Sequence, residues 1–350
     1  MNMSCPFSNT SETGLATVEL HALSAGHFTL PEEQFVRPAA PGARKTVPSL
    51  AFLVQHREPN SGYITRIVFD LGVRRVIDRY AEPIQRHLET RQPLTTHPDV
   101  VTSLGAGGLT PDDIDFVFYS HVHWDHVGEP RDFPHSTFVV GYGALDVLAG
   151  RSKGMRGGHS FFEPDLLGFS PTIELHDPAE KPQIISIVDE DGWDIDDTPP
   201  SIDTPSDPGT PIPFISNNIN IDGTWEEFGG LPAVIDVFKD GSLYIVDAPG
   251  HLTGHINLLA RTLNDDGSVS WVYLAGDACH DRRILRREKG ISEWLDAHGQ
   301  VCCIHADRAQ AEATIDRIRD LESKGVEIIL AHDVDWERDV RNAKRFFGAA

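Results

Sequence analysis

Four side chains of metal-binding type lie within six residues near the middle of this 350-residue chain. The apolar run just before them, Ile114–Tyr119, predicts a buried strand. Alternate side chains of an extended backbone point the same way, so His121 and His123 should project to one side at the strand's end. A turn then brings Asp125 and His126 back toward the same point. Zinc and similar divalent ions favour imidazole and carboxylate ligands, so this density of ligands predicts a metal site.

The HxHxDH pattern resembles the metallo-β-lactamase superfamily, and the rest of the chain agrees with that resemblance. Members of the superfamily need a later histidine, a bridging aspartate and a last histidine, each at the end of a strand. Three stretches match, each after an apolar run: Ala248–His255, Leu274–Asp277 and Ile328–Asp333. The resemblance covers roughly residues 45–335.

The resemblance implies two cations, with zinc expected and iron, manganese or cobalt also compatible with the ligands. The first cation would be bound by His121, His123 and His251. The second would be bound by Asp125, His126 and His332, and Asp277 would bridge the two cations. His255 matches a supporting position rather than a ligand. Asp70, in Phe69–Gly72, matches the first motif of the superfamily, where it orients a ligand or a loop; capping of the next turn is the alternative.

The chemistry that the resemblance implies is hydrolysis by a hydroxide that bridges the two metals. Two cations lower the pKa of a shared water and stabilise the oxyanion that forms at a carbonyl. Asp277 would pass the proton to the leaving group, and Asp125, Asp277 and His280 are the candidate catalytic residues. No serine or cysteine nucleophile is required, and Cys279 is interpreted as a small buried thiol.

Within the superfamily, the sequence around His251 and His255, the Gly26–Pro31 segment and the length are most similar to the N-acyl homoserine lactonase-like branch, which includes fungal lactamase-like relatives. Lactonases of that branch often carry a tyrosine three residues after the bridging aspartate, where this chain has His280. Histidine could donate the same hydrogen bond or carry a proton. We therefore expect a hydrolase, with detoxification as one role, that opens a small cyclic ester or cyclic amide such as a γ-lactam.

Three other functions stay open at this stage. A thioesterase of the glyoxalase II kind shares the motif but typically adds a basic C-terminal helical region. A diiron flavoprotein usually has glutamate where this chain has Trp124, and it adds a flavodoxin domain. A non-catalytic metal-binding protein is expected to have lost ligands, whereas all seven are present here.

Composition limits the partners. The net charge of −23 opposes binding to nucleic acid, and the short basic cluster Arg282–Arg287 is interpreted as a solvated helix face. No apolar run is long enough to span a membrane, and no signal peptide is expected from the N-terminus. Four cysteines, two of them adjacent, favour a reducing cytoplasm over a disulfide framework. The expected partner is a small molecule, and a homodimer stays open.

The resemblance implies an α/β fold with four layers, αβ/βα, in which two mixed sheets are flanked by helices. We expect one domain over residues 1–350, with a flexible arm at 1–15 and an acidic, proline-rich insertion at 181–210. Alternation and turn signals predict strands at 18–23, 49–56, 63–70, 136–140, 231–238, 243–247, 256–262, 269–274 and 326–330. Periodicity predicts helices at 74–91 with a break at Pro83, at 141–148, at 307–324 and at 335–347, and a loop at 26–32. The Phe-rich segment 151–170, with His159, Phe161 and Phe162, could line a pocket or belong to the core.

Overall fold

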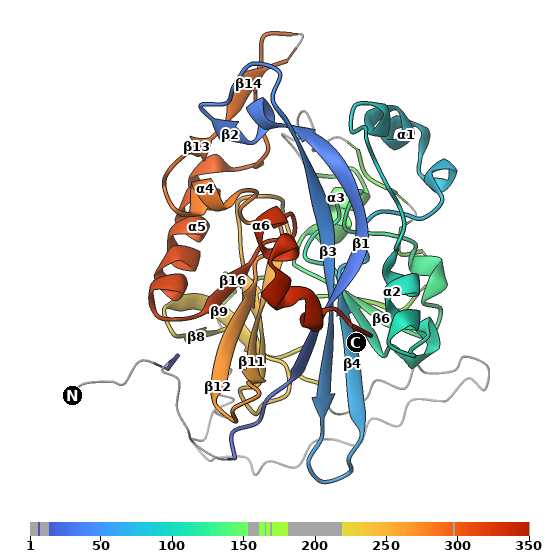
Figure 1. Cartoon of the computed structure of the whole chain (residues 1–350), viewed down its shortest axis with the longest axis vertical. Coiled ribbons are helices and arrows are strands. Elements are labelled where there is room, and N and C mark those ends of the chain that lie inside the picture. The colour runs from blue at the N-terminus through green and yellow to red at the C-terminus, as the bar shows by residue number, and fades with distance from the viewer. Residues whose placement is uncertain are drawn as a thin grey trace, which may run out of the picture.

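The computed structural model consists mainly of two six-stranded sheets packed face to face (Figure 1). It describes residues 6–7, 14–152, 161–164, 166–168, 170–180, 219–296 and 298–349. The first sheet has the order β1-β3-β4-β5-β6-β7, with bounds Glu19–Pro31, Arg44–Arg57, Ile64–Phe69, Phe116–Phe118, Thr137–Val140 and Thr172–Glu174. The second has the order β16-β12-β11-β10-β9-β8, with bounds Glu327–Ile329, Val269–Leu274, Ile256–Leu263, Leu243–Asp247, Leu231–Asp236 and Glu226–Phe228.

Both sheets are mixed. In the first, β1, β3 and β4 are antiparallel, whereas β4 to β7 run parallel. In the second, β16 is parallel to β12 and the other pairs are antiparallel. Two small sheets pair β2 (Val36–Arg37) with β13 (Gly290–Ile291), and β14 (Glu293–Leu295) with β15 (Val301–Cys303).

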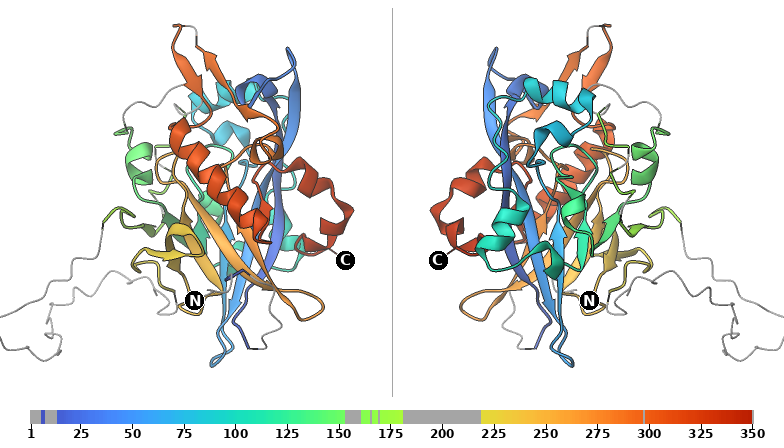
Figure 2. Two further views of the ribbon diagram at one scale, coloured as in Figure 1. Left: turned by 90° about the vertical axis from the view of Figure 1, so that its left-hand side faces the viewer. Right: turned by 90° about the vertical axis from the view of Figure 1, so that its right-hand side faces the viewer.

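Helices cover the outer face of each sheet, which completes four layers (Figures 1 and 2). The α-helices are α1 Glu82–Glu89, α2 Val100–Ala106, α3 Ala144–Leu148, α4 Arg282–Leu285, α5 Arg308–Ser323 and α6 Val334–Arg338. Strand β3 shows how the sequence builds the layers. Phe52 and Val54 point into the apolar cluster between the sheets, while Ala51 and Leu53 point outward to a cluster that includes Leu104 of α2. This is the period of two expected of a strand that is buried on both faces.

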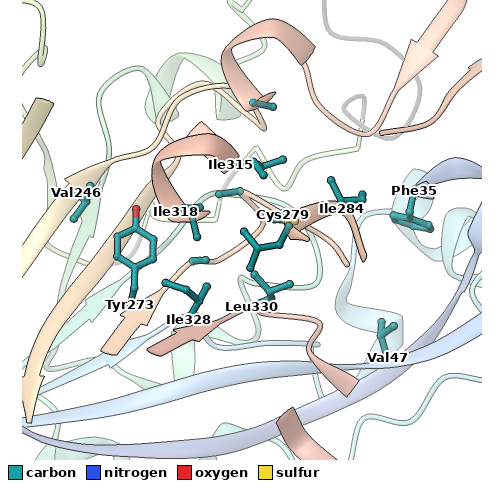
Figure 3. Close-up of a cluster of buried hydrophobic side chains, with 14 of the residues drawn as sticks. Phe35, Val47, Val246, Tyr273, Cys279, Ile284, Ile315, Ile318, Ile328 and Leu330 are labelled. Carbon is teal, nitrogen blue, oxygen red and sulfur yellow. The ribbon is translucent and has the colours of Figure 1, made fainter. Parts of the chain in front are cut away.

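The second sheet is covered on its outer side by α5 and α4. Ile315, Ile318 and Leu321 of α5 pack with Tyr273 of β12 and with Ile328 of β16 in one buried cluster (Figure 3). The predicted helix at 307–324 is confirmed, with Asp307 accepting a hydrogen bond from the Gln310 amide as its N-cap. The predicted two-sheet α/β architecture is confirmed as well.

Parallel directions bring several strand ends to one edge of the sandwich. Strands β10, β12 and β16 run the same way, because β10 and β12 are both antiparallel to β11. The segments after β4 and β5 of the first sheet are joined there too, since the Asp70 amide donates to the Phe118 carbonyl. The loops that carry the predicted ligands therefore begin at neighbouring strand ends.

Four local predictions were wrong. Residues 26–32 are mostly strand, because β1 continues to Pro31 beside β3 after a bulge between Ser24 and His27. Segment 74–91 breaks just before Pro83, as predicted, but less of it is helical than expected: it holds a short 3-10 helix, Ile77–Arg79, and α1, whose first turn contains Pro83.

The predicted helix at 335–347 is interrupted at Asp339, where extended backbone (φ −69°, ψ 116°) separates α6 from the 3-10 helix Val340–Arg345. The basic cluster is also less solvated than expected, since Arg282 lies 2.7 Å from Asp333 and Arg283 lies 2.8 Å from Asp281. The acidic insertion and His159 lie outside the described residues.

Candidate metal centre

Three histidines from two loops point their ring nitrogens at one spot. His121 Nε2 lies 2.8 Å from His123 Nδ1, and His251 Nε2 lies 3.2 Å from His121 Nε2 and 3.0 Å from His123 Nδ1. Two of them follow β5 and one follows β10. Zinc–nitrogen bonds of 2.0–2.1 Å in a tetrahedron separate nitrogens by about 3.3 Å, which is close to this spacing. Together with Asp277, these side chains form a buried group that could hold a metal ion.

A second buried group lies beside the first. Asp125, His126, Asp277 and His332 place one ligand atom each within 4.8 Å of one another. His332 Nε2 lies 3.4 Å from Asp125 Oδ2 and 3.1 Å from Asp277 Oδ1. His126 Nε2 lies 3.3 Å from the same Asp277 oxygen. The structure thus brings together all seven predicted ligands, in the two sets that the sequence predicted.

Asp277 belongs to both groups and divides its carboxylate between them. Its Oδ2 lies 3.5 Å from His251 Nε2, whereas its Oδ1 faces His126 and His332. Among the described residues, His126 Nε2 and Asp277 Oδ1 are buried and make no hydrogen bond of good geometry. Buried polar atoms of this kind need a partner. A cation in the second group would supply a partner to both atoms, and the first group offers three imidazole nitrogens and Asp277 Oδ2 to another, so these side chains fit two metal ions.

Contacts behind the two groups fix the direction of the imidazoles. Asp70 Oδ2 lies 2.8 Å from His126 Nδ1, and Asp70 also accepts hydrogen bonds from the Ser120 amide and hydroxyl, each at 2.7 Å. The His332 Nδ1 proton points to the Pro48 carbonyl at 2.8 Å. Each contact leaves the Nε2 lone pair facing the centre. Of the two roles left open for Asp70, the structure therefore shows ligand orientation.

Burial favours the neutral, metal-binding form of two histidines of the first group. It lowers the pKa of His121 and of His251 well below the ordinary imidazole value, and neighbouring histidines lower both further. In the second group, burial would lower the pKa of His126 and of His332, but the carboxylate of Asp277 raises both. Burial alone would raise the pKa of Asp277, but His332, His126 and His280 hold it well below its usual range. Neutral imidazole and ionised carboxylate are the ligand forms.

The other predicted residues lie around the centre. His255 Nε2 accepts the Asp277 amide proton at 3.1 Å, which is a supporting role, and it belongs to neither group. His280 Nε2 lies 3.0 Å from Asp277 Oδ2. Cys279 is buried in the apolar cluster, where it donates to the Asp281 carbonyl (Figure 3). Burial raises the pKa of its thiol to about 12, so this cysteine is no nucleophile at neutral pH.

A cavity opens over the centre. Its walls come from segments that are far apart in the chain, and no sequence pattern predicted that they would lie together. With its mouth included it encloses about 430 Å³. Apolar and aromatic side chains form much of the wall, together with His87 and Arg91. His305 is a further buried histidine, with its ring centroid 5.2 Å from that of His251 and 5.1 Å from that of His280. A lone histidine or arginine carries no periodic signal, so only tertiary contacts reveal these residues.

The Phe-rich segment contributes to the site. Phe162 stacks on His123, with ring centroids 5.6 Å apart and planes 9° apart. Phe161 packs on His87 at 4.9 Å. Both residues pack, partly buried, against apolar clusters, and neither is among the residues that line the cavity, so the core interpretation fits them better. His27, by contrast, contacts Glu337 at 2.7 Å and belongs to neither metal group.

Comparison with known proteins gives the family. The model of the metallo-β-lactamase superfamily matches residues 59–259. The chain belongs to the metallo-β-lactamase superfamily. The predicted resemblance is confirmed, and a superfamily with these histidine and aspartate groups suits divalent metal ions.

Several curated fungal proteins are similar to this chain. The chain is 27% identical over 91% of its length to the cytochrome P450 monooxygenase mpaDE of Penicillium brevicompactum, covering 34% of that protein. It is 27% identical over 76% of its length to the γ-lactamase FDB1 of Fusarium pseudograminearum, covering 54% of it. The chain thus spans about a third of the length of the first curated relatives it matches.

Solved structures agree on the fold. An N-acyl homoserine lactone hydrolase, with the product N-hexanoyl-L-homoserine at its catalytic metal centre, superposes with a TM-score of 0.59. The match covers 93% of this chain and 97% of the other at 16% identity. At that identity the likeness shows the shared fold. Among the described residues, no helix is both long and apolar enough to cross a membrane.

Proposed function

We propose that this chain is a two-metal hydrolase that opens a small cyclic ester or cyclic amide. One observation carries the proposal: the two oxygens of Asp277 face separate groups of imidazole nitrogens, which is the arrangement of a bridging ligand. Zinc is the expected metal, because histidine predominates among the ligands. When bound, the two cations would acidify a shared water and polarise a carbonyl.

The protein's own residues supply orientation and proton handling. His280 Nε2 lies 3.0 Å from Asp277 Oδ2, so it can fix that carboxylate or take up a proton from it. Asp125 and Asp277 are the two carboxylates of the centre, and both are buried. Phe28 and Trp124 line the cavity and exclude water from the reacting group.

The relatives support the ring-opening reaction. Two curated relatives are named γ-lactamases, and the superposed structure is a lactone hydrolase. Cyclic amides and cyclic esters share the carbonyl that this centre would polarise, and they differ in the leaving atom. The presence of His280 at the position where lactonases often have tyrosine favours a substrate other than acyl homoserine lactone.

Elemental analysis and a substrate panel test the proposal together. We expect two transition-metal ions per chain, and turnover of at least one member of a panel of lactones, γ-lactams and thioesters. Asp277→Asn should lower kcat by roughly 100-fold or more and release at least one ion. Asp112→Asn, a change at an exposed carboxylate, is the control and should leave both unchanged.

Two outcomes would contradict the proposal. One is carefully purified, folded protein that binds no stoichiometric metal. The other is an Asp277→Asn variant that keeps the turnover of the original chain. Hydrolysis confined to thioesters would replace the proposed ring opening with a thioesterase activity.

A further inference from the structure

Arg91 is a buried cation in the wall of the cavity over the metal centre. It follows α1 in the chain and lines the cavity together with His123, Asp125 and Asp277. Its exposed fraction is 8%. Arginine is rarely buried to this extent unless it is paired with a carboxylate.

The contacts of Arg91 are with neutral groups. Its Nε donates to His87 Nε2 at 3.2 Å, and one Nη2 proton goes to Gln34 Oε1 at 3.1 Å. A guanidinium has five N–H donors, and the other three make no side-chain or backbone hydrogen bond within the described part of the chain. No carboxylate of the described residues lies within ion-pair distance of it.

Arg91 nevertheless keeps its charge. Burial lowers its pKa to about 10, and Asp125 opposes that shift. The side chain is therefore protonated at neutral pH. Asp125 is one of the proposed metal ligands, so its charge would be largely compensated by a cation. With the metals in place, the guanidinium has no anionic partner of its own in the described structure.

Arg44, another arginine in this part of the structure, has a structural role and serves as a comparison. Arg44 donates to the backbone carbonyls of Thr29, Thr90 and Gln92 and so ties β1 to the segment after α1. Arg91 makes no such ties through its side chain. It is held instead by His87 and Gln34, and it lines the cavity.

The rest of the wall fits a ring that carries the anion. Phe28 and Trp124 lie edge to face with centroids 4.9 Å apart, and both line the cavity. His87 packs on Trp124 at 6.0 Å, and burial lowers the pKa of His87 to about 4, so it adds no charge. Thus the described residues give the cavity an apolar surface, several proposed metal ligands and Arg91 as its only arginine or lysine.

We propose that the substrate carries a carboxylate, which pairs with Arg91 while the ring carbonyl faces the metal centre. This inference rests on the proposed ring-opening function and adds the charge of the substrate to it. A planar guanidinium binds a carboxylate through two parallel hydrogen bonds, and three free donors suffice for that geometry. Because the chain has a net charge of −23, which repels anions, a local cation is needed to hold such a substrate.

Matched probes test the inference on the metal-loaded protein. The first pair is 5-oxotetrahydrofuran-2-carboxylate and its methyl ester, which share the lactone ring. We expect Arg91→Met to raise KM for the carboxylate roughly 10- to 100-fold with a smaller change in kcat, and to change KM for the ester little. Arg91→Lys should restore part of the loss, because it keeps the charge without the planar fork.

A control and a binding measurement complete the design. Arg86→Met removes an exposed arginine of α1 that pairs with Glu82, and it should behave like the original protein. Calorimetry with benzoate and with benzamide needs no turnover, and Arg91→Met should weaken the binding of benzoate alone.

The outcomes separate the two proposals. If no lactone or lactam is turned over, but Arg91→Met selectively loses benzoate, the ring-opening function fails and the anion site stands. If Arg91→Met affects the carboxylate and the ester equally, or affects neither, and benzoate binding is unchanged, the anion site is refuted.

Discussion

Replacement of Asp70 by asparagine should weaken one metal group selectively. Asp70 is buried and accepts three hydrogen bonds of 2.7–2.8 Å, from the amide and hydroxyl of Ser120 and from His126 Nδ1. Asparagine matches its shape and also tolerates its positive φ of 64°. The new NH₂ group would face two donors, so His126 would have to move its proton to Nε2. That nitrogen is the one that faces Asp277 Oδ1.

The magnitude follows from this change of tautomer. Loss of a residue that orients a metal ligand typically lowers metal affinity 10- to 100-fold, which is about 1.4–2.7 kcal/mol. The loss should fall on the group of Asp125, His126 and His332. Within the described part of the chain, the group of His121, His123 and His251 contacts Asp70 through Ser120 alone, whose hydroxyl lies 3.0 Å from His121 Nδ1. It should therefore keep nearly all of its affinity.

Competition with a graded chelator measures the two affinities separately. The original protein should release its two ions in two steps, and Asp70→Asn should shift one step to a lower chelator concentration while the other step stays in place. Asp115→Asn is the control, because Asp115 also accepts a backbone proton, from Arg66, but it is half-buried and precedes β5, whereas the predicted ligands follow that strand. Both variants need unchanged near-ultraviolet circular dichroism. If folded Asp70→Asn releases both ions as the original protein does, the orienting role of Asp70 is refuted.

Two further predictions concern buried titratable groups. Burial raises the pKa of Asp247 to about 6, above its value of about 3.9 in the unfolded chain. Ionisation of Asp247 therefore lowers the free energy of unfolding. This loss grows from pH 4 to pH 6 and is constant at higher pH. Asp247→Asn should therefore raise the free energy of unfolding by about 1–2 kcal/mol at pH 8 and by about half as much at pH 5. Urea titrations at both pH values measure this gain. An equal gain at both pH values would contradict the prediction. Cys279→Ala should leave kcat within about twofold, because the thiol donates to a carbonyl away from the centre; a loss of 100-fold in a steady-state assay would show that the thiol takes part in the chemistry.

Much of the fold could be predicted from local patterns. Hairpins such as β9–β10 and β11–β12 carry apolar strands and glycine-containing turns, and both form as predicted. Local periodicity failed where the chain depends on distant partners. Residues 26–31 continue β1 because β3 pairs with residues 27–31 beyond the bulge, although the glycine and proline of this segment indicate a loop.

The sequence by itself indicated the family and, through that resemblance, the seven side chains predicted as ligands. Side-chain type and strand-end position are local properties, so HxHxDH and the later histidines and aspartate could be recognised without coordinates. Only the tertiary structure decided which Asp277 oxygen faces which group, that Asp70 directs His126, and that Arg91 enters the cavity wall. These facts depend on contacts between segments tens to hundreds of residues apart, and such contacts leave no periodic trace in the sequence.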